Sequence, residues 1–461
     1  MKKLTVILLF ISYICSASEL TISKPLLYIE KGTIYSVFNL KWSNAWKNDK
    51  NHDAIWIFSK LKQNGGKTKH ISIAQDGHKI INTFKGQGSN LKIETSKDGV
   101  GLFIFPSNNY RGDIEVTLRI NLNIADFAGV NVRNSSLDIF GIEMVMIPPG
   151  GYYLGSPNQS VRQLGAFYNP DESSNGLIKV KSENDKFEIS PNGNIYYKAK
   201  EYEGDQKGQI PSGYPKGVDA FYIMKYELLE GQYVGFLNSL SQPQRRIIHE
   251  EKDYNGSIEF NAGVFSTENL NRPCPFVSWD DAMAYADWCG LRPMTEFEYT
   301  KAARGTVVPK GIDYPWGLDS KEVIQRLPDK NGNLIMLNGW DESDLSDETK
   351  KYFGASYYWV MDLSGSLWER VITVGHEKGR NFKGTHGDGI LSEQANANNE
   401  IWPLGDEGQG GIGFRGGGFY GYNREYHQFN PFSPIVLRPY GGWHGGMRSI
   451  AYGTRFVRSS D

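Results

Sequence analysis

Glycine and aromatic residues are abundant in this chain, and this limits the folds that it can adopt. The 461 residues include 52 glycines, and Phe, Trp and Tyr make up 13% of the sequence. Glycine usually accounts for about 7% of a protein, and it is unfavourable inside helices and strands but well suited to turns. The composition therefore predicts short segments joined by many turns and loops, rather than a helical bundle.

Length and charge limit the number of domains and the class of binding partner. A chain of 461 residues corresponds to two or three domains at roughly 100–200 residues each. The 50 basic and 52 acidic residues leave a net charge of −2. Because such a balance provides no positive field for a phosphate backbone, it disfavours nucleic acid as a partner.

The N-terminus has the pattern of a secretory signal peptide, predicted at residues 1–17. Lys2 and Lys3 precede an apolar run, Leu4–Ile14, and Ala17 is a small residue suited to cleavage. The run is shorter than the roughly 20 residues that span a bilayer. With no other long apolar run, the sequence predicts an exported protein without a transmembrane anchor, located in the periplasm, on the outer-membrane surface or outside the cell.

The sequence has three cysteines: Cys15, Cys274 and Cys289. Cys15 as a lipid anchor is the weaker alternative to signal cleavage, because Ile14 stands where a lipoprotein signal has a small residue. The other two either pair in an oxidising compartment or remain buried thiols. A disulfide would close a loop of about fifteen residues and contribute about 3 kcal/mol by the chain-entropy model.

Residues 18–137 are predicted to form a β-sandwich-like domain. Short apolar segments rich in β-branched and aromatic residues alternate there with Asn, Asp, Gly and Lys clusters. The strongest are Gly32–Leu40, Ala54–Leu61, Gly101–Phe105 and Ile114–Ile120. Three tryptophans, Trp42, Trp46 and Trp56, are expected in the core or at its rim, and a carbohydrate-binding platform is the alternative.

Residues 138–461 are predicted to form a second domain, with an insertion loop at about 156–217. A helix is expected over Leu229–Leu240, where apolar residues recur at three- and four-residue steps. Another helix begins after Ser278, with Asp281 completing a capping box, and ends at Gly290. A further helix begins at Thr295.

The segment FVSWDDAMAYADWCGLRPMTEFEYTKAARG, at Phe276–Gly305, resembles the signature of the formylglycine-generating enzyme (sulfatase-modifying factor) family. Other segments resemble family motifs in the family's order: Met144–Gly155, Phe221–Phe236, Tyr314–Gly317, Asp362–Glu369, Arg415–Phe419 and Gly453–Phe456. The resemblance implies an α+β fold, the modified C-type-lectin-like domain with low regular secondary structure.

The same resemblance indicates that the family's copper chemistry is missing. Its oxidase binds copper through two cysteines that follow the R-G-G-S-W segment, and thiolates are soft ligands that select Cu(I). Here Gly421 and Tyr426 stand at those positions, and no cysteine follows Cys289. Copper is therefore not expected, and Cys274 and Cys289 lie in a different part of the family fold.

Other redox metals also lack a recognisable ligand set. His376, His386, His427 and His444 are scattered through the C-terminal loops, without the compact spacing of metal-binding pairs. A branch of similar fold binds iron through histidines of an additional helical domain. The N-terminal part of this chain is predicted to be β-structure, which disfavours that branch.

Calcium is the metal that the resemblance favours. The family carries structural Ca²⁺ sites made of side-chain and backbone oxygens, which suit a hard cation. By resemblance, Asp362, Ser364, Leu367 and Glu369 form one site, to which Ser364 and Leu367 contribute backbone carbonyls. Ser366 stands where the family usually has Asn. Asn338 is the best ligand for a second site. The alternative is that Trp368 packs in the core and Glu369 pairs with a buried arginine.

The C-terminal loops are the predicted ligand-binding surface. Tyr, Trp, Asn and Arg separated by glycine are typical of adaptable binding surfaces, although these aromatic residues would also serve simply to pack the loops. The predicted ligand-binding residues are Tyr420, Tyr422, Asn423, Arg424, Tyr426, His427, Trp443 and His444.

The sequence thus predicts an exported, non-catalytic binding or structural protein. An envelope protein or a glycan is the expected partner, and a cell-envelope, gliding or secretion-associated role is plausible. Two enzymatic alternatives remain: altered chemistry in the same cleft, or formylglycine-generating oxidation of protein cysteines.

Overall fold

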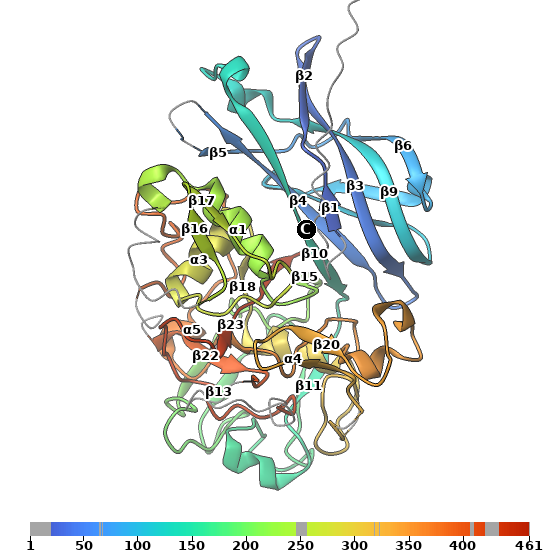
Figure 1. The fold of residues 1–461 in the computed structure, drawn as a ribbon. Coiled ribbons are helices and arrows are strands. Elements are labelled where there is room, and N and C mark those ends of the chain that lie inside the picture. The colour runs from blue at the N-terminus through green and yellow to red at the C-terminus, as the bar shows by residue number, and fades with distance from the viewer. Residues whose placement is uncertain are drawn as a thin grey trace, which may run out of the picture.

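The structure is a computed structural model that describes residues 20–63, 66, 68–245, 256–317, 319–321, 323–405, 410–419 and 433–460 (Figure 1). The predicted signal peptide and Cys15 lie outside these residues. The strands of the N-terminal part occupy one end of the molecule, and the helices, short hairpins and long loops occupy the other.

Two antiparallel sheets organise the described residues. The five-stranded sheet has the order β1-β3-β9-β6, with β2 also paired to β3. Its strands are β1 (Leu20–Ile22), β2 (Leu26–Glu30), β3 (Thr33–Lys47), β6 (Lys79–Lys85) and β9 (Tyr110–Leu122). The eight-stranded sheet has the order β18-β24-β15-β10-β4-β8-β7, with β5 paired to β4. Its strands are β4 (Asp53–Lys62), β5 (Thr68–Ile71), β7 (Leu91–Thr95), β8 (Leu102–Pro106), β10 (Ser136–Ile147), β15 (Phe221–Met224), β18 (Arg292–Pro293) and β24 (Phe456–Ser459).

Alternating residues explain how the first sheet packs. Along β3, Phe38, Leu40 and Trp42 are buried while Asn39 and Lys41 are exposed, which is the two-residue period of a strand with one covered face. The pairing of β3 with β9 shifts register between Trp42 and Ala45. The four strands predicted from the N-terminal sequence are confirmed, and β3 and β9 are longer than expected.

The second sheet runs through both predicted domains. Strand β4 is buried on both faces: Ile55 and Ile57 pack with the first sheet, and Trp56 and Phe58 pack with the helical part. The predicted boundary at 137/138 falls inside β10, which pairs with β4 over ten residues. No break in the sheet marks the predicted boundary, so the separate N-terminal domain stays a prediction.

Short elements complete the described fold. The helices are α1 (Glu230–Ser239), α3 (Trp279–Trp288), α4 (Glu296–Arg304) and α5 (Glu377–Arg380). The 3-10 helices are η1 (Gly88–Asn90), η2 (Ile124–Phe127), η3 (Val132–Asn134), η4 (Gln159–Leu164), η5 (Glu342–Asp344) and η6 (Lys350–Phe353). The small sheets pair β11 (Tyr152–Leu154) with β12 (Ile178–Val180), β13 (Phe187–Ile189) with β14 (Gly208–Ile210), β16 (Glu259–Asn261) with β17 (Val264–Ser266), and β19 (Arg326–Pro328) with β20 (Leu334–Met336); the order β22 (Ile412–Arg415), β21 (Trp368–Ile372), β23 (Tyr452–Gly453) forms another.

The predicted helix starts are confirmed by their caps. Ser278 accepts a hydrogen bond from the Asp281 amide, and the Asp281 carboxylate accepts one from the Ser278 amide. Thr295 and Glu298 make the same reciprocal pair at α4. Each pair satisfies amides that the first helical turn leaves without partners.

Residues 156–217, predicted as an insertion loop, contribute to the core. Phe187 and Tyr214 pack edge-on against Phe297 of α4, and the Tyr214 hydroxyl donates to the carbonyl of Ile372 at 3.1 Å. The segment has little regular structure, as its glycine and proline content indicates, but its apolar residues are buried.

Several open alternatives from the sequence are settled by burial. Trp42, Trp46 and Trp56 are all within the core, so their ring faces are not available as a carbohydrate platform. Cys274 and Cys289 are buried free thiols. Among the described residues, no helix is long and apolar enough to cross a membrane.

A buried ion cluster links β4, β10 and β15. The Lys225 ammonium lies 3.0 Å from the Glu143 carboxylate and 3.5 Å from that of Asp53, and Asp53 also accepts from the Trp46 amide at 2.8 Å. Burial raises the pKa of Asp53 to about 7, more than Lys225 lowers it.

Replacing Asp53 with Asn is expected to alter how stability depends on pH. An unfolded Asp has a pKa near 3.9, so the raised pKa of Asp53 adds stability that is full below about pH 4 and lost as pH rises through about 7. The unfolding free energy of the wild type minus that of Asp53→Asn should fall over this range, by up to about 1.4 kcal/mol per pH unit. Urea unfolding of both proteins from pH 4 to 8 measures it; a constant difference contradicts the assignment.

Candidate functional site

The R-G-G-G-F segment leads from the sheet to the positions of the missing cysteines. It begins at the end of β22, which pairs with β21, and Gly416 and Gly417 both have positive φ, 89° and 76°. A Cβ on Gly416 would also approach the Leu363 carbonyl to 3.1 Å, so the turn requires glycine there. Gly421 and Tyr426 lie outside the described residues.

A cleft of about 360 Å³ lies beside this segment, with Phe419 in its wall. Its lining is mostly polar. The lining residues are Gly256, Ser257, Asn269, Arg272, Pro273, Pro275, Phe276, Lys330, Asn331, Gly332, Asn333, Phe419 and Ile450. Phe419, the last described residue of this segment, stands two residues before Gly421 in the sequence.

Arg272 fixes the shape of this cleft. Its Nε donates to the buried Glu230 carboxylate at 2.7 Å, its Nη1 to the Asn331 carbonyl at 2.9 Å, and its Nη2 to the Ser257 hydroxyl at 2.9 Å. One guanidinium thus joins the first turn of α1 to the β19–β20 turn, because its planar donors reach three directions.

The turn between β19 and β20 lines the cleft and is held by Asp329. The Asp329 carboxylate accepts hydrogen bonds from the amides of Asn331 and Asn333, at 2.8 and 3.0 Å. Lys330 is exposed at the tip of this turn. These residues were missed from the sequence; the Asn331-Gly332 pair signals a tight turn, but nothing in the sequence indicates that it faces the R-G-G-G-F segment.

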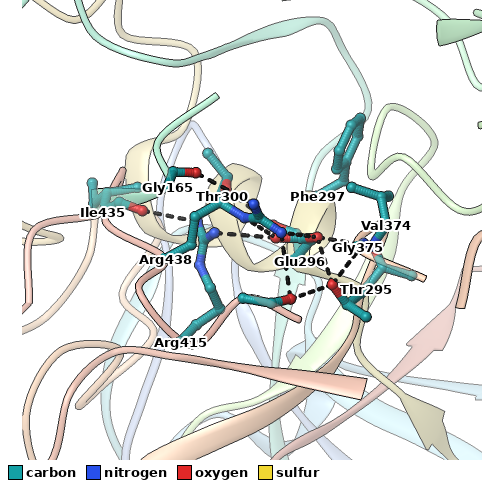
Figure 2. A network of polar contacts seen from close by, with 12 residues as sticks. Gly165, Thr295, Glu296, Phe297, Thr300, Val374, Gly375, Arg415, Ile435 and Arg438 are labelled. Atoms are coloured by element: carbon teal, nitrogen blue, oxygen red, sulfur yellow. Dashed lines mark hydrogen bonds and ion pairs between the residues drawn. The ribbon is translucent and has the colours of Figure 1, made fainter. Parts of the chain in front are cut away.

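The Glu296 carboxylate is the centre of a buried polar network (Figure 2). It accepts from Arg438 Nε at 2.9 Å, Arg415 Nη1 at 3.3 Å and the Val374 amide at 2.8 Å. Arg415 also donates to the Ile435 carbonyl at 2.9 Å. Two guanidinium groups therefore share one carboxylate at the first residue of α4.

The residues predicted to bind calcium are engaged in ion pairs. The two carboxylate oxygens of Asp362 accept from Arg326 Nη1 at 2.6 and 2.5 Å. Both oxygens of Glu369 accept from Arg455, at 2.8 and 2.9 Å. Because a cation would have to displace two guanidinium groups, this arrangement does not fit calcium ligation at these carboxylates.

A third carboxyl completes this cluster. Glu227 is buried and accepts hydrogen bonds from the Ser366 hydroxyl at 2.9 Å and the Leu367 amide at 3.1 Å. Burial raises its pKa well above the usual range, and the nearby Glu369 carboxylate adds to the shift. Burial also raises the pKa of Glu369, although the Arg455 guanidinium opposes the shift.

The other predicted calcium ligands are Asn338 and the backbone carbonyls of Ser364 and Leu367. Asn338 is exposed and its side-chain amide donates to Gln325 at 2.7 Å. The Ser364 hydroxyl donates to the Ser433 carbonyl at 2.9 Å, which leaves the prediction for its backbone carbonyl untested. No group of three or more His, Cys, Asp or Glu side chains within the described ranges is arranged to hold a metal ion. The calcium sites stay a prediction that the present side-chain pairing does not favour.

The predicted ligand-binding loops are described only in part. Tyr420, Tyr422, Asn423, Arg424, Tyr426 and His427 lie outside the described residues. Trp443 is half-buried and packs against Tyr440, Phe414 and Tyr452. The ring of His444 lies 5.6 Å from that of His376, so at least these two histidines, distant in sequence, are neighbours on the loop face.

The two remaining thiols are poor substitutes for the family's copper ligands. Cys274 and Cys289 are both part of the largest apolar cluster, and burial raises the pKa of the Cys289 thiol far above its usual value. A buried thiol that keeps its proton is neither a nucleophile nor a ligand for copper.

Comparison with known proteins supports the sequence resemblance. The sulfatase-modifying factor enzyme 1-like domain matches residues 174–459, which is more than half of the chain. This chain belongs to that family. The match gives the C-terminal part its C-type-lectin-like fold with few helices and mixed sheets.

Similar proteins in the family include enzymes and an inactive member. The formylglycine-generating enzyme of Thermomonospora curvata is 32% identical over 111 residues, covering 23% of this chain and 35% of that protein. The inactive C-alpha-formylglycine-generating enzyme 2 of Mus musculus is 28% identical over 162 residues, 32% and 49% of the two chains. The uncharacterized protein YfmG of Bacillus subtilis is 25% identical over 324 residues, 65% and 63%. The chain thus spans between about a third and just under two thirds of the length of these relatives.

Replacing Glu296 with Gln should destabilise the protein strongly. The substitution leaves Arg415 and Arg438 buried without their carboxylate, which costs about 3 kcal/mol of unfolding free energy. Glu94→Gln is the matched control, because Glu94 and its partner Lys92 are both about half exposed and such a pair contributes less than about 1 kcal/mol. Equal effects of the two substitutions on urea unfolding would show that Glu296 is not a structural centre.

Proposed function

We propose that this chain is a non-catalytic member of the family that binds a segment of another protein in the cleft beside Phe419. The observation that carries the proposal is the cysteine inventory. No cysteine follows Cys289 in the sequence, and the two internal thiols are buried. The thiolate pair that the family's oxidation requires is therefore missing.

The comparisons and the cleft support this proposal. One of the similar proteins is named an inactive C-alpha-formylglycine-generating enzyme 2, so loss of catalysis on this scaffold has a parallel. The cleft of about 360 Å³ is bounded by Phe419 at the end of the R-G-G-G-F segment. A scaffold that keeps this concavity without the reacting groups retains the means of binding.

The lining favours a polypeptide as the occupant. The cleft offers amide side chains at Asn269, Asn331 and Asn333 and a positive charge at Lys330, which can pair with the backbone groups and an acidic side chain of an extended segment. Glycan binding would use an exposed aromatic face, whereas Phe419 is 3% exposed. Glycan recognition is therefore the outcome against which the peptide proposal is tested.

Export belongs to the same proposal. The signal-peptide pattern of residues 1–17 supports a location in the cell envelope or outside the cell. We therefore propose a protein of a cell-envelope, gliding or secretion-associated assembly as the occupant of the cleft. Cleavage after Ala17 is read directly from the N-terminal sequence of the mature protein isolated from its host.

The purified protein should lack copper-dependent oxidation of cysteine. We expect no conversion of a cysteine-containing peptide to its aldehyde by mass spectrometry, with or without added Cu(I), because no accessible thiolate pair is present to hold the metal. A copper-loaded family enzyme assayed in parallel shows that the conditions are adequate. Stoichiometric copper together with oxygen-dependent aldehyde formation would overturn the proposal.

Reversing the charge at the cleft should weaken partner binding. Lys330→Glu places an acid where an acidic segment of the partner would lie, and the captured amount of an envelope protein should fall by about tenfold or more, the equivalent of about 1.4 kcal/mol. Lys310→Glu makes the same charge change at an exposed residue outside the cleft lining and serves as the control. Equal capture by both variants, or capture competed by oligosaccharides instead, contradicts a peptide cleft.

A further inference from the structure

A second cavity, of about 150 Å³, lies where the N-terminal strands meet the helical part of the molecule. Strands β4 and β5, the end of α1 and the residues around Gly389 contribute to it. Its lining residues are Lys60, Thr68, Lys69, His70, Ser239, Leu240, Gln244, Trp288, Gly389, Ile390 and Leu391. Lys69 and Ile390 are exposed, so the cavity reaches solvent beside them.

Lys60 is unusual because it is a buried cation without a counter-ion. Its side chain comes from the last part of β4 and is 1% exposed. Its Nζ donates to the Gly389 carbonyl at 2.6 Å and lies 3.2 Å from His70 Nδ1, and the Trp288 ring is 5.4 Å away. Within the described part of the chain, no carboxylate forms an ion pair with it.

These surroundings make the amine a nucleophile near neutral pH. Burial lowers the pKa of Lys60 to about 7, because the nearby Asp287 and Asp388 carboxyl groups only partly offset the loss of solvent. Burial likewise holds the pKa of His70 well below its usual value, and the Lys60 charge lowers it further. A neutral imidazole therefore stands beside an amine that is about half uncharged at pH 7.

The contacts of His70 orient its ring to accept a proton from the Lys60 amine. With Nδ1 facing the Lys60 amine, the imidazole presents a lone pair to a proton that leaves Nζ. His70 Nε2 is buried and has no hydrogen-bond partner within 3.5 Å among the described residues. Nδ1 is thus the ring atom placed to exchange a proton with the amine.

We propose that this cavity binds a small aldehyde or ketone through an imine with Lys60. The Nζ lone pair attacks the carbonyl carbon, the C–N bond forms, and His70 Nδ1 accepts the proton that Nζ loses while the carbonyl oxygen is protonated from solvent. His70 then returns its proton to the hydroxyl, which leaves as water while the C=N bond forms, and the proton that remains on nitrogen returns to solvent. One water leaves, and nothing is oxidised or reduced. At roughly 30 Å³ per water-sized group, a cavity of about 150 Å³ admits a compound of about five heavy atoms.

A structural role for Lys60 is the competing explanation. Its bond to Gly389 ties the 387–391 segment to β4, and the Asp287 carboxylate binds the same segment through the Asp388 amide at 3.0 Å. If Lys60 only connects these two segments, it would not react with an aldehyde, because its amine would stay packed and hydrogen-bonded. Reactivity therefore separates the two explanations.

The test is reductive trapping on the folded, full-length mature protein. Acetaldehyde and cyanoborohydride at pH 7 should ethylate Lys60 at least about fivefold faster than the exposed Lys41, as counted by peptide mapping. Benzaldehyde, which exceeds the size of the cavity, should show no preference for Lys60. Labelling of Lys41 with no labelling of Lys60 by acetaldehyde overturns the proposal.

His70→Asn tests the proton-accepting group. Asn keeps an oxygen acceptor for the amine but removes the basic nitrogen, and the labelling of Lys60 should slow by about a hundredfold, the low end of general-base effects, while that of Lys41 is unchanged. Should this variant fail to fold, the pH profile of the wild type decides. Labelling of Lys60 is expected to level off above about pH 7, whereas a rate that rises steadily to pH 10, as for an ordinary lysine, contradicts the proposal.

Discussion

The carboxylate of Glu296 is the contact on which the loop-rich part of the molecule depends. It binds Arg438, Arg415 and the Val374 amide, and these three come from segments far apart in the sequence. A fold with few helices cannot rely on repeated backbone ladders to order its loops. Directional, charge-assisted hydrogen bonds supply that order instead, and the Arg455–Glu369 and Arg326–Asp362 pairs do the same nearby.

The eight-stranded sheet provides the rigid support for both candidate sites. Lys60, which lines the small cavity, belongs to strand β4. Strands β10 and β15 connect β4 to β24. The cleft beside Phe419 is lined by loop residues, and Arg272 ties them to α1 through Glu230. The two sites thus differ in kind: one is enclosed by strands and helix ends, the other is shaped by turns.

Much of the local structure is predictable from the sequence because it follows from local rules. Ser278 and Thr295 mark helix starts through caps within four residues, and the alternation in β3 marks a half-buried strand. The family assignment rests on motifs that the chain keeps in order. Pairing between distant residues has no such signal. Nothing near Asp362 or Glu369 in the sequence reveals that Arg326 and Arg455 bind them. Lys60 likewise looks like an ordinary strand residue in the sequence, because only the fold brings His70 and Gly389 next to it.

The position of β24 has a consequence for how the chain matures. Phe221 pairs with Ser459 and Arg292 with Val457, so the strand made last lies between two strands made much earlier. A chain emerging from a ribosome or a secretion channel must hold β15 and β18 with unpaired edges until residues 456–459 arrive. Such edges are prone to association with other chains. The protein therefore depends on protection of these edges between the synthesis of β15 and the synthesis of β24. Loss of residues 456–459 would leave the edges of β15 and β18 permanently unpaired.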